Sequence, residues 1–548
     1  MPMSRGVKTG IIGTVFAGML TVAGFGAFNI YSALDSGGGG GKPSGQSPLA
    51  ADSPISSAPP TAKEVKDAAD AFLTAWQSGD TTKAGQLTDS PTTAASALTG
   101  YRQQAHVTSV QITPGTPTAT GMPYTVQAHV SYGGINTLWK YGSSLTVERG
   151  TGNKPVVKWA PSVLQPDLTD GDTLVTGRAP APDVQVVDRS GKVLTSAQYP
   201  SLVRILPDLI HRYGSKVKGG TAGVQTYIED SDGSNRRTLH VLRKGKATQL
   251  RTTLDAGVQA AAEKAVAKEQ DAGVTAVDIH TGGILAVAYN PPTGTDWALQ
   301  DEDAPGSTFK VVTAAALIDN GGLTPQSSAP CINGDNYLTG RVYKNEDNMN
   351  NAGATLDWDF AKSCNTGFIR QAGKLGGNGL VDTAARFGLT QRWNVGTPVT
   401  QPSVPGGSGD ELTSEMIGQG QVQMNPLIMA SVAATARTGD FHQPLIVSPD
   451  LVDGPIARAN GISSRTSGYL RAMMHSTISY GTASGVMAGF GPDTGAKTGS
   501  AEVDGATRTN SWFLGYHDDV AASAVVRGGG AGNAAAGPVV AAVLRAGS

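Results

Sequence analysis

A long apolar stretch lies near the beginning of the chain, in the segment IIGTVFAGMLTVAGFGAFNIYSAL. Arg5 and Lys8 precede this stretch, and the next charged residue is Asp35. A helix of about 20 apolar residues spans a bilayer, and positive charge at one flank marks the cytoplasmic side. A cleaved signal peptide is the alternative, but the stretch ends in a poor cleavage site. The pattern predicts a single-pass protein of the cell membrane, with a cytoplasmic tail at 1–9, an uncleaved transmembrane helix at 10–34 and an extracytoplasmic remainder.

Gly, Ser and Pro dominate residues 35–60, which predicts a tether with nothing to pack. The segment AKEVKDAADAFLTAWQSGD then repeats apolar residues at helical spacing and ends at Gly79. The segments YTVQAHVSYG, SSLTVER and KPVVKWAPSVL read as alternating strands separated by glycine-containing turns. A helix followed by antiparallel strands predicts a small α+β domain over 61–165. Its tryptophans are interpreted as core residues: Trp76, Trp139 and Trp159.

The patterns after this domain divide into two regions. Residues 166–245 contain short strands and turns without a long helix, which predicts a β-rich connecting or pedestal region. From residue 246 onward the segment QLRTTLDAGVQAAAEKAV has helical spacing, and GVTAVDIHTGGILAVAYNP reads as a hairpin with its turn at Thr281–Gly283. Helical and strand segments alternate to the end, so residues 246–548 are predicted to form one large α/β domain.

Composition and charge exclude several classes of function. The chain has 548 residues, which gives room for about three domains. Its net charge of −2 argues against a nucleic-acid partner, which requires clustered Lys and Arg. The histidines form no H-E-x-x-H pattern, so we expect no catalytic metal and no cofactor. The two cysteines, Cys331 and Cys364, allow one disulfide in an oxidising exterior or two buried, unpaired thiols.

The stretch APGSTFKVVTAAAL places Ser307 and Lys310 three positions apart, where an apolar helix begins. On an α-helix, positions i and i+3 are neighbours, so the hydroxyl and the amine would share one edge of the first turn. A serine nucleophile needs a base within hydrogen-bond reach, which a neutral lysine amine can supply. The alternative is a solvated helix start, with Ser307 near the N-cap and the lysine in water.

Two further short motifs follow along the chain, in DFAKSCNTGFIRQ and DTGAKTGSAEV. They supply the residues Ser363, Cys364, Asn365, Lys497, Thr498, Gly499 and Ser500. Each motif alone carries little weight, because Ser215 also begins a Ser-x-x-Lys sequence and Lys8 also begins Lys-Thr-Gly. Order and context distinguish the set that contains Ser307, which opens an apolar helix, whereas Ser215 lies in the polar stretch YGSKVKGG.

In this order the three motifs resemble the signature of the serine penicillin-recognising enzymes, and the chain is similar to a class B penicillin-binding protein. The segments AVDIHTGGILAVAYNP, IGQGQVQMNPLIMASVAATARTGDF and STISYGTASGV also resemble that family. Residues 61–165 resemble the N-terminal extension of the methicillin-resistance (MecA-type) members, a nuclear-transport-factor-like cone with no known chemistry. We find no glycosyltransferase segment between the predicted anchor and residue 246, which argues against a bifunctional class A protein.

The resemblance implies a transpeptidase domain with an antiparallel sheet flanked by helices, and a peptidoglycan D,D-transpeptidase activity. Ser307 would attack the penultimate D-Ala of a stem peptide, release the terminal D-Ala and form an acyl-enzyme, and β-lactams would acylate the same serine. Lys310 would be the base, Ser363 would relay a proton and Asn365 would hold the substrate backbone. The substrate-binding residues would be Lys497 and Thr498 at the terminal carboxylate, Gly499 beside the substrate, and Ser500, whose N–H would form the oxyanion hole with that of Ser307.

The resemblance leaves several alternatives open. A D,D-carboxypeptidase would use the same residues with water as acceptor, and a β-lactam sensor or non-catalytic scaffold would bind without turnover. A class A β-lactamase requires a deacylating glutamate after the second motif, whereas Glu346 precedes it. The partners implied are peptidoglycan stem peptides, β-lactams, the membrane through residues 10–34 and the glycosyltransferases of the cell-wall machinery.

Overall fold

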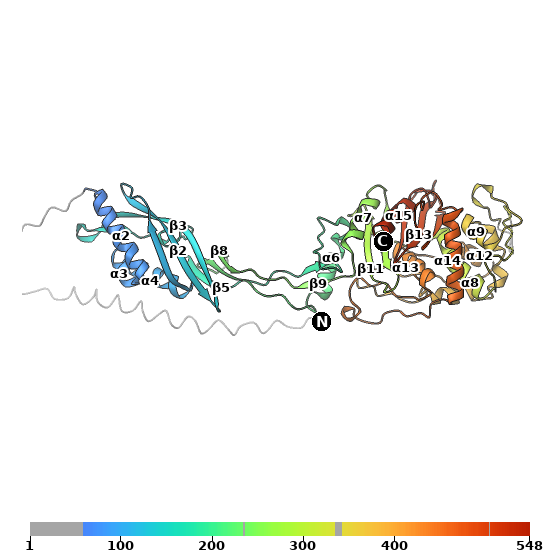
Figure 1. Cartoon of the computed structure of the whole chain (residues 1–548), viewed down its shortest axis with the longest axis horizontal. Helices are drawn as coiled ribbons and strands as arrows, with labels where there is room; N and C mark the ends of the chain where they lie inside the picture. Colours follow the sequence, from blue (N-terminus) through green and yellow to red (C-terminus); the bar gives the residue numbers. More distant parts are fainter. Residues whose placement is uncertain (1–57, 234–235, 335–341, 504, 548) are drawn as a thin grey trace, which may run out of the picture.

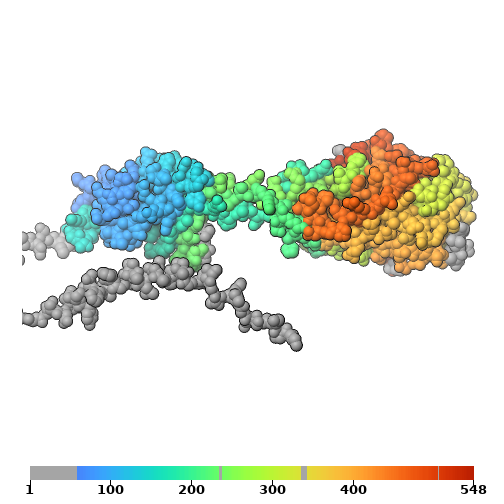
Figure 2. Space-filling model, turned by 90° about the horizontal axis from the view of Figure 1, so that it is seen from below, coloured from blue at the N-terminus to red at the C-terminus, as the bar shows by residue number. Residues whose placement is uncertain are grey.

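The computed structural model describes residues 58–233, 236–334, 342–503 and 505–547 of the chain. Within these residues two compact parts lie at opposite ends of the molecule, and a narrow connection joins them (Figure 1, Figure 2). The predicted cytoplasmic tail, the transmembrane helix and most of the predicted tether lie outside the described residues. Among the helices of the described ranges, none is long and apolar enough to cross a bilayer.

The N-terminal part, blue to cyan in Figure 1, is an antiparallel sheet with helices packed against it. Its elements are α2 (Ala62–Ser78), α3 (Thr81–Gln86), α4 (Pro91–Gln103) and the strands, in sheet order, β1 (Val107–Pro114), β2 (Gly121–Tyr132), β3 (Ile135–Arg149) and β4 (Pro155–Lys158). Helix α2 begins with a capping box at Thr61 and ends at Gly79, which has left-handed backbone angles. Trp76 and Trp139 are buried, and Trp159 packs against the same core from a partly exposed position. The predicted small α+β domain is confirmed.

The chain between the two parts contributes to both of their cores. The strands β5 (Thr173–Arg178), β7 (Val224–Glu229) and β8 (Arg236–Arg243) form a sheet whose buried residues join the N-terminal core. The elements β6 (Gln185–Val187), η2 (Pro200–Val203), α6 (Ile205–Tyr213) and β9 (Gln249–Arg251) pack on the C-terminal core. Helix α6 was not expected in a region predicted to be β-rich. Pro207 interrupts its helical pattern in the sequence, but lies in the first turn, where a missing N–H costs no hydrogen bond.

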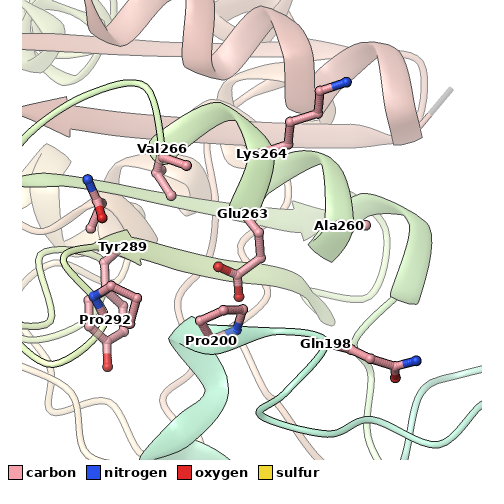
Figure 3. Close-up of a pocket in the computed structure, with 10 residues that line it drawn as sticks. Gln198, Pro200, Ala260, Glu263, Lys264, Val266, Tyr289 and Pro292 are labelled. Atoms are coloured by element: carbon pink, nitrogen blue, oxygen red, sulfur yellow. The ribbon is translucent and has the colours of Figure 1, made fainter.

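Where this connection meets the C-terminal part, polar contacts fix it to α7 (Ala256–Val266). The backbone N–H and the hydroxyl of Ser201 donate to the carboxylate of Glu263 at 3.0 and 2.9 Å. A cavity of about 350 Å³ lies at this junction and is lined by Pro200, Glu263 and Tyr289, among others (Figure 3). None of the residues of the three motifs lines this cavity.

The C-terminal part contains a five-stranded antiparallel sheet between two groups of helices. In sheet order the strands are β11 (Ile284–Asn290), β10 (Ala272–Asp278), β14 (Val520–Val526), β13 (Asn510–His517) and β12 (Thr494–Ala501). On one face the sheet packs with α7 and α15 (Ala536–Gly547), and on the other with α8 (Lys310–Asp319), α13 (Pro426–Thr438) and α14 (Ser464–Ser479). The predicted antiparallel sheet flanked by helices is confirmed, and β12, which carries the third motif, is its edge strand.

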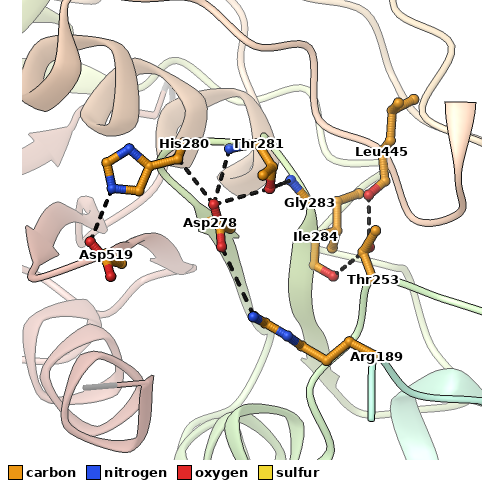
Figure 4. A network of polar contacts seen from close by, with 9 residues as sticks. All are labelled: Arg189, Thr253, Asp278, His280, Thr281, Gly283, Ile284, Leu445 and Asp519. Carbon is orange, nitrogen blue, oxygen red and sulfur yellow. Dashed lines mark hydrogen bonds and ion pairs between the residues drawn. The ribbon is translucent and has the colours of Figure 1, made fainter. Parts of the chain in front are cut away.

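The predicted hairpin is formed by β10 and β11, and polar contacts fix its turn (Figure 4). A carboxylate oxygen of Asp278 accepts from the N–H of His280 at 3.1 Å and from the N–H and hydroxyl of Thr281, each at 3.0 Å. The hydroxyl of Thr253 donates to the carbonyls of Ile284 and Leu445, each at 2.8 Å. The turn expected at Thr281–Gly283 is confirmed, and the hairpin is tied to the loop after α13.

Candidate active site

Ser307 and Lys310 lie on adjoining turns at the start of a buried helix. The residues Gly306–Phe309 form a 3-10 turn, η3, and α8 begins at Lys310. In a 3-10 turn the side chains at i and i+3 eclipse each other, so the hydroxyl and the amine share one side of the turn. The expected single α-helix is therefore replaced by a 3-10 turn that leads into an α-helix. Gly306 makes this entry possible, because it has a φ of 52° and donates its N–H to Gly418 at 2.9 Å.

The amine of Lys310 is fully buried and has two hydrogen-bond acceptors. Its Nζ donates to the carbonyl oxygen of Ser363 at 2.8 Å and to Oδ1 of Asn365 at 2.7 Å. Burial lowers the pKa of Lys310 to about 7, although Glu346 and Asp359 pull it upward. A neutral amine has two N–H groups and one lone pair. Because both acceptors are carbonyl oxygens, they occupy the two N–H groups and leave the lone pair for another partner.

Ser307 is the partner that the sequence predicts for this lone pair. Its side chain is partly exposed, whereas Thr308, Phe309 and Lys310 on the same turn are buried. In the described part of the chain the Ser307 hydroxyl makes no hydrogen bond. The serine is therefore accessible to a substrate, and its proton is not committed to another acceptor.

Ser363 connects the two buried lysines of the site. It follows α9 (Leu356–Lys362) and has a φ of 63°, a left-handed conformation that is rare for a residue with a side chain. Its carbonyl accepts from Lys310, and its hydroxyl accepts from Nζ of Lys497 at 2.9 Å. Lys497 also donates to the carbonyl of Thr498 at 2.8 Å, and burial together with the charge of Lys310 holds its pKa well below the usual range. The turn at Ser363 thus aims one polar group at each lysine.

Asn365 begins the short helix α10 (Asn365–Ile369) and uses both ends of its side-chain amide within the protein. Its oxygen accepts from Lys310 at 2.7 Å, and its nitrogen donates to the carbonyl of Lys344 at 3.1 Å. The amide therefore holds the lysine amine, and its second N–H stays available for the substrate backbone that the sequence predicts as its partner.

The third motif packs directly against the turn that carries Ser307. A Cβ atom on Gly499 would lie 2.9 Å from the backbone nitrogen of Thr308 and 3.0 Å from the carbonyl oxygen of Pro305. A Cβ atom on Gly306 would lie 2.7 Å from the carbonyl oxygen of Ser500. Both glycines are therefore required by the close packing of β12 against η3, and this packing brings Ser500 next to the turn of Ser307.

Several residues that support the site were not identified from the sequence. The hydroxyl of Thr482 lies 2.5 Å from that of Thr498, and its N–H donates to the carbonyl of Ala361 at 3.0 Å. Thr482 belongs to the family-like segment STISYGTASGV, which was the available signal. Asp359 is fully buried, and burial raises its pKa to about 8. Within the described residues neither of its carboxyl oxygens has a hydrogen-bond partner.

The two cysteines form the predicted disulfide, Cys331–Cys364, with a Cα–Cα distance of 6.2 Å. Cys364 stands between Ser363 and Asn365, so the bond ties the second motif to the segment that precedes α9. The alternative of two unpaired thiols is wrong for this structure. Among the described residues, Cys331, Cys364 and Asp359 lie close enough together to ligate a metal ion. The two sulfurs are bonded to each other, so they are not available as thiolate ligands.

Family models match most of the described chain. The model for the penicillin binding protein transpeptidase domain matches residues 272–545, and that for the NTF2-like N-terminal transpeptidase domain matches residues 64–172. The chain therefore belongs to the penicillin-binding protein transpeptidase family. The N-terminal match and the relatives below identify it as a class B penicillin-binding protein with a MecA-type N-terminal domain.

Two curated relatives of the chain come from mycobacteria. Penicillin-binding protein PbpB of Mycolicibacterium smegmatis is 30% identical over 346 residues, which cover 56% of this chain and 52% of the relative. Peptidoglycan D,D-transpeptidase PbpA of Mycobacterium tuberculosis (strain H37Rv) is 28% identical over 288 residues, 46% of this chain and 56% of the relative. The matched region thus spans about half the length of these relatives.

Solved structures share the fold. The D,D-transpeptidase domain of a peptidoglycan glycosyltransferase from Eggerthella lenta has a TM-score of 0.51 at 20% identity and covers 68% of this chain and 98% of that one. Penicillin-binding protein PBP2 of Pseudomonas aeruginosa in complex with WCK 5153 has a TM-score of 0.52 at 21% identity and covers 67% and 96%. At these identities the similarity concerns the fold.

Proposed function

We propose that this protein is a peptidoglycan D,D-transpeptidase that works through an acyl-enzyme on Ser307. The observation that carries the proposal is the state of Lys310, whose buried amine has carbonyl partners for both N–H groups and a pKa of about 7. Such an amine can accept the proton of the hydroxyl that shares its side of the turn. Relatives of the chain are named peptidoglycan D,D-transpeptidases, which supports the same reaction here.

In the first step Ser307 Oγ attacks the carbonyl carbon of the penultimate D-Ala while Lys310 accepts the hydroxyl proton. The resulting oxyanion is assigned to the backbone N–H groups of Ser307 and Ser500, which belong to two segments in direct contact. The bond to the nitrogen of the terminal D-Ala then breaks, and this nitrogen takes up a proton as it leaves. Ser363 can relay it: its hydroxyl gives its own hydrogen to the nitrogen and takes one from Nζ of Lys497, and the proton that Lys310 accepted restores the ammonium of Lys497.

Lys497 and Thr498 are assigned to the terminal carboxylate of the substrate. Lys497 is buried with a lowered pKa, and a carboxylate beside it would favour the charged ammonium form. The Thr498 hydroxyl lies at the same end of β12, where Thr482 holds it. A β-lactam carries an equivalent carboxylate, and attack of Ser307 on its ring carbonyl would open the ring and leave the enzyme acylated.

In the second step the amine of a neighbouring stem peptide attacks the acyl carbon, the bond to Ser307 Oγ breaks, and a proton from the amine passes through Lys310 to the serine oxygen, which completes the cross-link. The test is turnover of a peptide ending in D-Ala-D-Ala in the presence of an acceptor amine, followed by mass spectrometry. The proposal expects one D-Ala released for each cross-linked product. Release of D-Ala with hydrolysed peptide alone would show a D,D-carboxypeptidase, and no release at all would contradict the proposal.

We also propose that residues 10–34 anchor the protein in the cell membrane, with the catalytic domain outside the cytoplasm. The apolar stretch after Arg5 and Lys8 supports this location. A structural neighbour with a TM-score of 0.52 and 21% identity belongs to a peptidoglycan synthase complex that coordinates polymerization and crosslinking. This likeness supports a glycosyltransferase partner in the membrane. Deletion of residues 1–34 should move the protein from the membrane to the soluble fraction.

A further inference from the structure

A single asparagine from another segment holds the turn that contains the second motif. Asn345 lies 20 positions before Asn365 in the sequence, and only 5% of its surface is exposed. The segment that carries it is attached to the motif by the Cys331–Cys364 disulfide. Asn345 is absent from the three motifs of the sequence analysis, so no role has yet been assigned to it.

The side-chain amide of Asn345 makes several hydrogen bonds, most of them to residues at the beginning of α10. Its oxygen accepts from the N–H groups of Asn365 and Thr366, both at 3.0 Å. Its nitrogen donates to the carbonyl of Met349 and to the hydroxyl of Thr366, both at 3.0 Å. The first N–H groups of a helix have no partner within the helix and require a cap. Asn345 supplies this cap from outside the helix, and it uses both the acceptor and the donor end of its amide.

These bonds extend to the lysine base through Asn365. Asn345 fixes the backbone of Asn365, and the neighbouring Lys344 carbonyl accepts from the amide nitrogen of Asn365 at 3.1 Å. The oxygen of the Asn365 amide is thereby the end that faces Lys310, at 2.7 Å. If that amide turned over, two donors would face each other, and the lysine would lose one of its two acceptors.

We propose that Asn345 is a positioning residue of the acylation reaction, which holds Asn365 and, through it, the amine of Lys310 in the orientation that accepts the Ser307 proton. The proposal rests on the function proposed above for Ser307 and Lys310. The role proposed for Asn345 is to align the Lys310 amine with Ser307. A displacement of a catalytic group by about 1 Å can lower a rate about 100-fold.

Charged groups face Lys310 from three elements. They are Lys497 on β12, Asp359 on α9 and Glu346 in the 3-10 turn η4 (Glu346–Asn348). A carboxylate at position 345 would keep the two acceptor bonds, place an oxygen against the Met349 carbonyl and add a buried negative charge close to the amine. An added negative charge favours protonated lysine, so such a variant would require a higher pH for acylation.

The test compares Asn345→Asp and Asn345→Ala with Asn350→Asp and Asn350→Ala, which make the same changes at an exposed asparagine of the same segment. The second-order rate constant for acylation by a fluorescent penicillin is measured from pH 5 to 9, with the melting temperature of each variant.

We expect the acylation rate constant of Asn345→Ala to fall about 10- to 100-fold at neutral pH, as for a misplaced catalytic group. We expect the acid limb of Asn345→Asp to move to higher pH by about half a unit or more, with recovery of the rate at pH 9. Both controls should follow the wild type.

Two results would overturn the proposal. One is wild-type acylation in both Asn345 variants at every pH. The other is an equal loss at every pH in both, in proportion to their melting temperatures, which would indicate a structural role alone. Failure of the wild type to be acylated would instead count against the function proposed for Ser307, so the two proposals fail in different ways.

Discussion

Nζ of Lys497 donates a 2.9 Å hydrogen bond to the hydroxyl of Ser363, and this contact joins the third motif to the second. The carbonyl of the same serine accepts from Lys310, so the partly exposed Ser363 links two buried lysines from separate elements in one continuous chain. Two lysine amines this close to each other cannot both be charged at low cost. Burial and the charge of Lys310 together hold the pKa of Lys497 low, whereas burial lowers the pKa of Lys310, the lysine that can accept a proton near neutral pH.

Acylation should depend on pH through Lys310. Below the pKa of about 7 the amine is protonated and cannot act as a base, so the acylation rate should rise with pH up to about 7 and then level off. Lys310→Arg keeps the positive charge permanently, and we expect a loss of about 10²- to 10⁴-fold. The measurement is the acylation rate constant from pH 5 to 9, with Lys374→Arg, at an exposed lysine, as the control. A flat profile, or an active Lys310→Arg enzyme, would contradict the role of the base.

Gly499→Ala should disturb the turn that carries Ser307. The added Cβ would meet backbone atoms of Thr308 and Pro305 at 2.9 and 3.0 Å, so η3 has to move away from β12. We expect a loss of about 1–3 kcal/mol in the free energy of unfolding, as for overpacked sites, and slower acylation. Gly485→Ala is the matched control, because a Cβ there meets no atom within 4 Å. Equal stability and equal acylation of the two variants would show that Gly499 is not needed for this contact.

Loss of the disulfide should destabilise the C-terminal domain. Cys331 and Cys364 are 33 positions apart, and closing a loop of this size removes entropy from the unfolded chain equivalent to about 4 kcal/mol. The double substitution Cys331→Ser with Cys364→Ser should lower the melting temperature of this domain. Alkylation followed by mass spectrometry should label neither cysteine until the unfolded protein is reduced. Labelling of both without reductant would show that the bond is absent.

Asp359 should make stability fall as pH rises. Burial raises its pKa in the folded state to about 8 from an ordinary value of 3.8, so between these values the folded state binds the extra proton. Its stabilising contribution is complete below about pH 4 and is lost as pH approaches 8, at up to about 1.4 kcal/mol per pH unit. Asp359→Asn should remove this slope and be the more stable protein at pH 7. Urea unfolding at pH 5, 6 and 7 tests this, and parallel curves for the two proteins would contradict it.

The order of the motifs was enough to predict which residues come together, but not how they are held. Ser307, Lys310, Ser363 and Lys497 were predicted because each motif has a fixed local spacing. The 3-10 turn at Gly306 was not predicted, because it depends on the contact with Ser500, which is almost 200 positions away in the sequence. The orientation of the Asn365 amide could not be predicted for the same reason, since its partner Lys344 belongs to another segment.

The fold shows the same division between local and distant information. Helix α2, the strands β2, β3 and β4 and the hairpin of β10 and β11 have strong local patterns, and the structure contains them as expected. The connecting region was harder to interpret because its strands and α6 are short and complete two separate cores. Asp359 carries no sequence signal, because a single acidic residue in a short helix is usually solvated.

The most direct measurement of the acyl-enzyme is labelling with a fluorescent penicillin, in the wild type, Ser307→Ala and Ser215→Ala. Ser215 is exposed and begins the second Ser-x-x-Lys sequence, so it is a matched control for the nucleophile. Covalent label on the wild type and on Ser215→Ala, with none on Ser307→Ala, is the predicted result. An unlabelled wild type, or label that persists on Ser307→Ala, would contradict the acyl-enzyme on Ser307.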